Sequence, residues 1–116
     1  MPPRDPRVRV EDMLEAVRRI RRYTGGLGYE AFCADEKTVD AVVRNFEVIG
    51  EAARHVDDVT AARAPDLPWL DIRDMRNILI HEYFGVDLQT VWKTITDDLP
   101  GLEGRLADLL RDLDRT

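Results

Sequence analysis

Apolar residues recur in this chain at steps of three and four positions over long stretches, and this spacing most constrains the fold. The clearest stripe lies within residues 36–56 and comprises Val39, Val42, Val43, Phe46, Ile49, Ala52 and Ala53. Steps of three and four place side chains on one face of an α-helix, whereas a half-buried strand alternates with a period of two. No useful length of this sequence alternates in that way. The chain is therefore predicted to be all-α.

The first two predicted helices have recognisable ends. One begins near Glu11 and ends at residues 24–26, where two glycines after a threonine favour a C-cap. The next spans about residues 36–56, with Asp35 as its N-cap. Gly50 lies inside this second helix and costs about 1 kcal/mol relative to alanine. A glycine in that position often permits a neighbouring helix to approach closely.

Two more helices complete the pattern. The third begins around Pro68, with Asp66 near its cap, and closes at residues 84–85. Asp87 then caps a fourth helix, which Pro100 kinks or interrupts before it continues to the C-terminus. Four main helices joined by short connections predict an antiparallel helical bundle.

Length and composition indicate one domain. The chain has 116 residues, of which 44% are hydrophobic and 34% are charged, as is typical of a globular protein with a well-solvated exterior. Residues 1–8 contain three prolines and are predicted to be a flexible N-terminal arm, and residues 9–116 are predicted to form the single domain. A domain of this size often gains from a partner that covers residual apolar surface.

The charge limits which partners the chain can bind. Its formal net charge is −6, so it is a poor non-specific binder of polyanions, and any nucleic-acid role needs a local basic surface. Two such surfaces are available: the segment RRIRR at residues 18–22, and the trio Arg44, Arg73 and Arg76. The commoner interpretation of RRIRR is a solvated helix face.

Cysteine content and hydropathy indicate the compartment. The single cysteine, Cys33, excludes an intrachain disulfide and fits a reducing environment. The N-terminus lacks the apolar core of a signal peptide, and no apolar run is long enough to cross a membrane. We therefore expect a cytoplasmic protein. One cysteine and two histidines give no recognisable zinc spacing, so neither a metal nor a cofactor is expected.

Polar side chains enter the apolar pattern in the segment RNILIHEY, residues 76–83. At about 100° per residue, Arg76, Asn77 and His81 project from an arc outside the core stripe, and Tyr83 lies seven residues from Arg76 and is nearly aligned with it. An imidazole can move a proton near neutral pH, and a guanidinium can stabilise the charge of a pentavalent phosphate. Together they suit attack of an RNA 2′-hydroxyl on the neighbouring phosphate, a reaction that needs no metal.

Spacing alone leaves other interpretations of these residues open. Arg76 and His81 diverge by roughly 140° on one helix, so one copy makes an incomplete site, and two copies facing each other across a dimer would complete it. An arginine and a histidine on a helix are more often a surface pair, and Tyr83 alone is more often a packing residue. His55 is expected to be a residue at the C-terminal end of its helix, where the helix dipole stabilises it. Glu82 falls in the apolar arc, so the regular helix is expected to end or loosen near that residue.

The order of these residues resembles a known family. RNILIHEY is similar to the motif of HEPN-domain ribonucleases, which has an arginine, a polar residue directly after it, and a histidine after four intervening positions. The tyrosine two residues beyond the histidine, the following FGVD and the earlier RNFEVIGEA at residues 44–52 resemble the HepT-like toxins of the HEPN/MNT toxin–antitoxin family. The resemblance extends from the first predicted helix to DDLP at residues 97–100.

This resemblance implies a fold, an activity and a means of control. The fold would be the HEPN helical bundle, usually dimeric, with the motif helices of two subunits meeting at a cleft. The activity would be metal-independent endoribonuclease cleavage that leaves a 2′,3′-cyclic phosphate. Arg76 and His81 match the catalytic pair, and Asn77 matches the supporting polar position. Tyr83 matches the tyrosine that a partner nucleotidyltransferase antitoxin modifies with adenylyl groups from ATP.

The expected partners are a second copy of the chain, a cognate MNT-type nucleotidyltransferase antitoxin and an RNA substrate, either tRNA or mRNA. Arg73 and Arg44 are further candidate RNA-binding residues. Two alternatives remain: a non-catalytic HEPN module that binds nucleotide or RNA or regulates a partner nucleotidyltransferase, and a helical dimer that serves as a scaffold. The intact set of Arg76, Asn77 and His81 favours the ribonuclease, while the net acidity slightly favours the alternatives.

Overall fold

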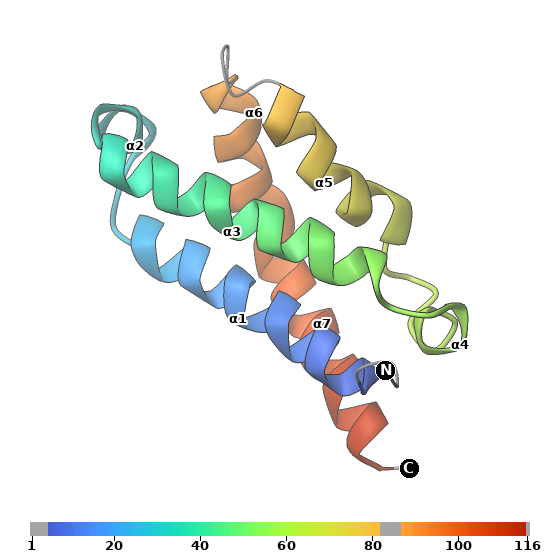
Figure 1. The fold of residues 1–116 in the computed structure, drawn as a ribbon. Coiled ribbons are helices and arrows are strands. Elements are labelled where there is room, and N and C mark those ends of the chain that lie inside the picture. Colours follow the sequence, from blue (N-terminus) through green and yellow to red (C-terminus); the bar gives the residue numbers. More distant parts are fainter. Residues whose placement is uncertain (1–4, 82–86, 116) are drawn as a thin grey trace.

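The computed structural model describes residues 5–81 and 87–115, and within residues 77–81 it describes the backbone only. The described residues are almost entirely helical and include no strand (Figure 1). The elements in chain order are α1 (Pro6–Thr24), α2 (Tyr29–Ala34), α3 (Glu36–Arg54), α4 (Asp58–Ala61), α5 (Trp69–His81), α6 (Leu88–Lys93), the π-helical turn η2 (Thr94–Asp98) and α7 (Leu99–Asp114). The all-α prediction is confirmed.

Helix α3 lies at the centre of the bundle. It packs against α1 on one side and against α5 on the other, and α7 packs against α1 (Figure 1). The predicted apolar stripe of residues 36–56 faces this core, because Val42, Val43, Phe46, Ile49, Ala52 and Ala53 are buried and Val39 packs against them. Within the described residues, no helix is long and apolar enough to cross a membrane.

Aspartate side chains cap α3 and α6, as the sequence predicts. Asp35 accepts a hydrogen bond from the backbone N–H of Thr38 at 3.1 Å, and Asp87 accepts one from the N–H of Thr90 at 3.4 Å. The threonine hydroxyls donate to the same carboxylates at 2.7 and 2.8 Å. These bonds stabilise the ionised form, so they hold the pKa of both carboxyl groups below its usual value.

Helix α1 begins earlier than the sequence suggested. Its first residue is Pro6 rather than one near Glu11, so the last three residues of the predicted arm belong to the helix. Proline suits a first turn, where no N–H donor is needed, and the Asp5 carboxylate accepts from the N–H of Arg7 at 2.9 Å. Arg7 also pairs with Asp114 of α7 at 2.7 Å, which ties this end of the helix to the bundle.

Helix α5 also starts differently from the prediction. The N–H of Ile72 donates to the carbonyl of Pro68 at 3.0 Å, and the helix starts at Trp69, three residues after Asp66. The carboxylate of Asp66 instead lies 3.7 Å from the guanidinium of Arg105 on α7. The predicted end at residues 84–85 lies outside the described residues.

A π-helical turn separates α6 from α7 immediately before Pro100. The N–H of Leu99 donates to the carbonyl of Thr94, five residues earlier, in place of the usual four. Pro100 has no N–H and is accommodated in the first turn of α7. The predicted interruption at this proline is confirmed.

The basic segment RRIRR forms an exposed face of α1 that is tied to neighbouring carboxylates. Arg18 and Arg21 pair with Glu103 of α7 at 3.8 and 2.6 Å. Arg19 pairs with Glu15, one turn earlier on α1, at 3.1 Å. These contacts agree with the interpretation of a solvated helix face, because three of the four guanidinium groups already have a carboxylate partner.

Candidate active site

The position of Arg76 is set by a close contact between α3 and α5 at Gly50. A Cβ atom added to Gly50 would lie 2.8 Å from the Cβ of Arg76 and 2.9 Å from its backbone nitrogen. Both distances are well inside van der Waals contact, so a larger residue would force the helices apart. The predicted close approach at this glycine is confirmed, and the residue that it accommodates is the arginine of the predicted catalytic motif.

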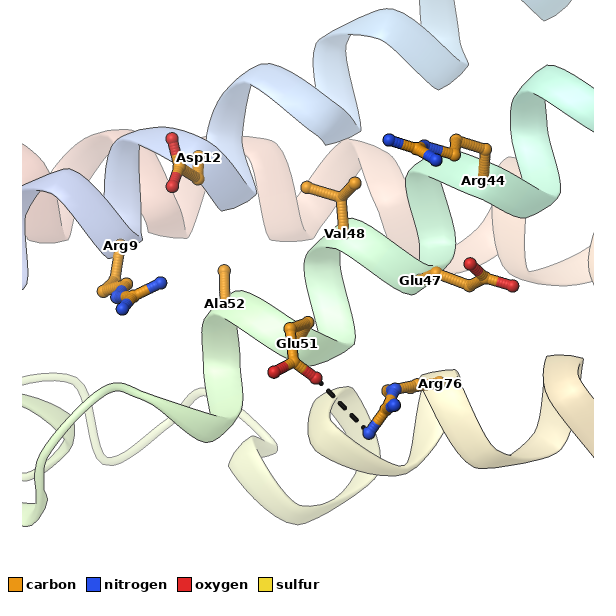
Figure 2. A pocket seen from close by; sticks show the side chains of 8 residues that line it. All are labelled: Arg9, Asp12, Arg44, Glu47, Val48, Glu51, Ala52 and Arg76. Carbon is orange, nitrogen blue, oxygen red and sulfur yellow. Dashed lines mark ion pairs between the residues drawn. The ribbon is translucent and has the colours of Figure 1, made fainter.

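The Arg76 guanidinium reaches back to the residue after this glycine. Its Nη1 lies 3.3 Å from Oε2 of Glu51 (Figure 2). The same carboxylate contacts Nε2 of His55 at 3.1 Å and Nη1 of Arg54 at 3.4 Å. The pKa of Glu51 is lowered by the hydrogen bond with His55 first and then by the positive charges of Arg76 and Arg54, while partial desolvation opposes the shift.

A cleft of about 310 Å³ opens beside this ion pair, between α1, α3 and α5 (Figure 2). It is lined by Arg9, Asp12, Arg44, Glu47, Val48, Glu51, Ala52 and Arg76. Three arginines and three carboxylates give the lining no net formal charge. Arg9 and Arg44 form no ion pair with another residue in the described part of the chain, so their N–H groups are available to a ligand. Such a cleft offers donors to phosphate oxygens and acceptors to the N–H groups of a base.

The predicted basic trio does not act as one surface. Arg44 and Arg76 line the cleft, but Arg73 turns to the C-terminal end of α3. Its Nε donates to the carbonyl of Ala53 at 3.1 Å and its Nη2 donates to that of Val56 at 3.3 Å. Arg73 therefore adds charged donors to two carbonyls at the C-terminal end of α3 and helps to hold α5 on α3. An RNA contact by Arg73 stays a prediction.

The remaining motif residues are described by their backbone or not at all. Helix α5 continues through Asn77 and His81, so the helical spacing on which the sequence argument rests holds for the backbone. Five residues on a helix correspond to a rise of about 7.5 Å and a rotation of about 140° from Arg76 to His81. The side chains of Asn77 and His81, and the whole of Glu82 and Tyr83, lie outside the described residues.

His55 lies where the sequence predicted, at the C-terminal end of α3. Its backbone N–H donates to the carbonyl of Ala52 at 3.1 Å, and its ring contacts Glu51. The residues that sequence reasoning missed are Arg9 and Asp12, which reach the cleft from α1. A spacing signal connects Glu51 with His55, four residues apart, but nothing local in the sequence connects Glu51 with Arg76.

Within the residues that the structure describes, the acidic and nucleophilic side chains do not cluster in the way that a metal site requires. No group of three or more His, Cys, Asp or Glu residues that could hold a metal ion occurs in the described part of the chain. The basic residues of the cleft are better suited to an anion than to a cation, because guanidinium groups present donors only.

The fold and the cleft define a small helical-bundle protein that presents the arginine of an arginine–histidine motif beside a mixed-charge cleft. The model of the family described as ribonuclease HepT-like matches residues 13–109. The chain therefore belongs to the HepT-like ribonuclease family.

The chain is similar in sequence to proteins of several organisms. The chain is 40% identical to a probable ribonuclease HepT of Thermococcus cleftensis over 86% of this chain and 91% of the relative. It is 35% identical to a candidate RNase of Methanocaldococcus jannaschii, over 98% of this chain and 94% of the relative. It is 34% identical to a candidate RNase of Caldanaerobacter subterraneus, over 91% and 95%. No solved structure matches the chain significantly.

Proposed function

We propose that this chain is a metal-independent endoribonuclease and the toxin of a toxin–antitoxin pair. The observation that carries the proposal is the position of Arg76. This arginine of the family motif lines a cleft, with its side chain 38% exposed. The same cleft is lined by Arg44, which has no carboxylate partner in the described part of the chain. A half-exposed guanidinium can still receive a phosphate from solvent.

The proposed reaction is an internal transfer at one phosphate of RNA. His81 removes the proton from a 2′-hydroxyl, and the 2′-oxygen forms a bond to the adjacent phosphorus while the bond from phosphorus to the 5′-oxygen breaks. Arg76 stabilises the added negative charge of the pentavalent transition state. The departing 5′-oxygen takes a proton from an acid, for which His81 of a second copy is suited. The products are a 2′,3′-cyclic phosphate and a 5′-hydroxyl.

Two copies are proposed to form the complete site. On one helix Arg76 and His81 diverge by about 140°, so a single subunit cannot direct both groups at one phosphate. A twofold dimer with the α5 helices at or beside the interface would place the arginine of one copy opposite the histidine of the other. Helix α5 is suited to this role because, within the described residues, it packs mainly against α3 and carries an exposed leucine, Leu70.

Cleavage of a labelled RNA by the purified protein tests the proposal. We expect cleavage in EDTA, a product end that resists phosphatase until the cyclic phosphate is opened with acid, and loss of cleavage in Arg76→Ala and His81→Ala. Arg54→Ala is the matched control, since it removes the other arginine that pairs with Glu51, in an exposed pair that contributes little to folding. Circular dichroism verifies that all three variants fold.

Two results would contradict the proposal in different ways. Activity that disappears on chelation and returns with magnesium would overturn the metal-independent mechanism. RNA or nucleotide binding without cleavage by the wild-type protein would support the non-catalytic HEPN module, which the balanced charge of the cleft also fits.

A further inference from the structure

The ion pair between Glu51 and Arg76 joins two helices at the candidate active site. Arg76 lies on α5 and Glu51 on α3, with Nη1 and Oε2 3.3 Å apart. The contact is next to Gly50, where the backbone of α5 comes closest to α3. Helix α3 therefore contacts both ends of Arg76: Gly50 lies against its backbone and Cβ, and Glu51 pairs with its guanidinium.

We propose that Glu51 is a positioning residue that orients the Arg76 guanidinium towards the scissile phosphate. The inference rests on the proposed ribonuclease function. An arginine side chain turns about several single bonds, so an unsupported guanidinium samples many positions over a half-exposed cleft. A partner on a second helix limits that sampling, and orientation of a charged group before the reaction is a large part of transition-state stabilisation.

The pairing leaves Arg76 able to bind a phosphate. A guanidinium has five N–H donors in a planar fork, and the contact with Glu51 is made through one nitrogen, Nη1. The carboxylate is also shared with Arg54 at 3.4 Å and with His55 at 3.1 Å, so its negative charge is divided among three partners. Glu51 with Arg54 and Arg76 carries a net charge of +1 when His55 is neutral. The cluster therefore remains attractive to an anion.

A second carboxylate of the same cleft provides a matched comparison. Glu47 lies one turn before Glu51 on α3 and lines the same cleft, but it forms no ion pair with another described residue. Replacement of either residue by glutamine removes one negative charge from the cleft. Effects of charge alone should therefore be common to Glu47→Gln and Glu51→Gln, and an effect of orientation should occur only at Glu51.

The first experiment measures kcat and KM for RNA cleavage by the full-length protein. We expect Glu51→Ala to lower kcat by about 10- to 100-fold, the range typical of a misplaced catalytic group. Glu51→Gln should lower kcat less, because it keeps an oxygen acceptor for Arg76. Glu47→Gln removes the same charge from the cleft, so any change in kcat or KM that it shares with Glu51→Gln is an effect of charge. Equal kcat values for the two glutamine variants would overturn the proposal.

The second experiment observes Arg76 without any RNA. The ¹⁵N NMR signals of an arginine guanidinium report whether its rotation is hindered by a partner. We expect hindered signals for Arg76 in the wild-type protein and in Glu47→Gln, and averaged signals in Glu51→Ala. Unchanged Arg76 signals in Glu51→Ala would show that Glu51 does not orient it. If the wild-type protein cleaves no RNA, the proposed function fails, and these signals still decide the role of Glu51.

Discussion

Gly50 on α3 and Arg76 on α5 lie so close that no methyl group fits between them. A Cβ on the glycine would be 2.8 Å from the arginine Cβ and 2.9 Å from its nitrogen. Since the same backbone contact places Arg76 at the cleft and Glu51 within reach of its guanidinium, the helix packing and the geometry of the site depend on one residue. Stability and activity are therefore expected to respond together to changes at this position.

Replacement of Gly50 by alanine is predicted to destabilise the protein. Crowding at a packed contact costs about 1–3 kcal/mol, which outweighs the helix preference of alanine. Gly104→Ala on α7 is the control, because a Cβ there meets nothing within 4 Å. That variant should raise the free energy of unfolding by about 0.5–1 kcal/mol. Urea unfolding measures both, and an equal change in the two variants would contradict the packing argument.

Arg73 and Arg44 are predicted to differ in what they support. Arg73→Ala should lower the free energy of unfolding by about 1–3 kcal/mol, because the carbonyls of Ala53 and Val56 lose their charged donor. Arg44→Ala should leave unfolding nearly unchanged and weaken RNA binding, with a smaller salt dependence of the affinity. Urea unfolding and RNA titrations at two salt concentrations separate these roles. A stable Arg73→Ala protein with weakened RNA binding would reverse the assignment of Arg73.

The pH dependence of stability should include a contribution from Glu51. Its folded-state pKa lies below the ordinary value of 4.5, chiefly because of the hydrogen bond with His55 and then the charges of Arg76 and Arg54. A lowered folded pKa contributes stability that is present above the unfolded pKa and is lost as pH falls through the folded pKa. NMR titration of the Glu51 carboxyl should therefore give a value below 4.5, and His55→Ala should raise it more than Arg76→Ala does. The reverse order would show that the arginine dominates.

Sequence alone predicted the parts of this fold that depend on local chemistry. The apolar stripe of α3, the caps at Asp35 and Asp87 and the interruption before Pro100 all follow from neighbours within a few residues. The predicted start of α1 is wrong, because the three prolines of residues 1–8 suggest an extended arm, whereas a proline directly after an aspartate cap is typical of the first turn of a helix. The pair Asp5 and Pro6 is a local signal for a helix start, but the high proline content of residues 1–8 points to the opposite conclusion.

The candidate site was less accessible, because its contacts join distant parts of the chain. Arg73 and Arg76 are both arginines on α5, and the sequence does not distinguish their roles. In the structure Arg73 donates to carbonyls of α3, whereas Arg76 lines the cleft. That difference depends on the rotation of α5 about its own axis relative to α3. The spacing of apolar residues along α5 predicts this rotation only approximately. The pairing of Glu51 with Arg76 is a tertiary contact of the same kind. Gly50 was the exception, because a glycine inside a strong helical stripe itself indicates close packing.

Dimerisation through α5 is predicted to depend on Leu70. This side chain is 73% exposed, which leaves a large apolar group on α5 available for a second copy. Leu70→Lys should weaken the dimer about tenfold or more, because a buried leucine contributes about 1.5–3 kcal/mol. Val59→Lys on α4 is the control, since Val59 is 79% exposed but lies on another helix. Light scattering at micromolar concentration measures the change. A wild-type monomer that retains activity would rule out the shared site.

Adenylylation of Tyr83 is predicted to switch the enzyme off. Tyr83 follows Arg76 by seven residues, which on a regular helix would correspond to two turns, about 10 Å along the axis and nearly the same face. An adenylyl group there would bring a negatively charged phosphate towards Arg76, where it would compete with the RNA phosphate for the guanidinium. The added nucleoside would also occupy space needed by RNA. The protein should remain folded, because neither effect involves the bundle core.

Peptide mapping after incubation with the cognate nucleotidyltransferase and ATP tests this switch. The chain has three tyrosines, and Tyr23, whose side chain is 38% exposed on α1, is a built-in control for non-specific modification. We expect the adenylyl mass on Tyr83 but not on Tyr23, together with loss of RNA cleavage. Tyr83→Phe should cleave RNA and should resist inactivation by the transferase, because it lacks the phenol oxygen that accepts the adenylyl group. A protein that is fully inactivated while Tyr83 stays unmodified would show that the antitoxin acts by another route, such as occlusion of the cleft.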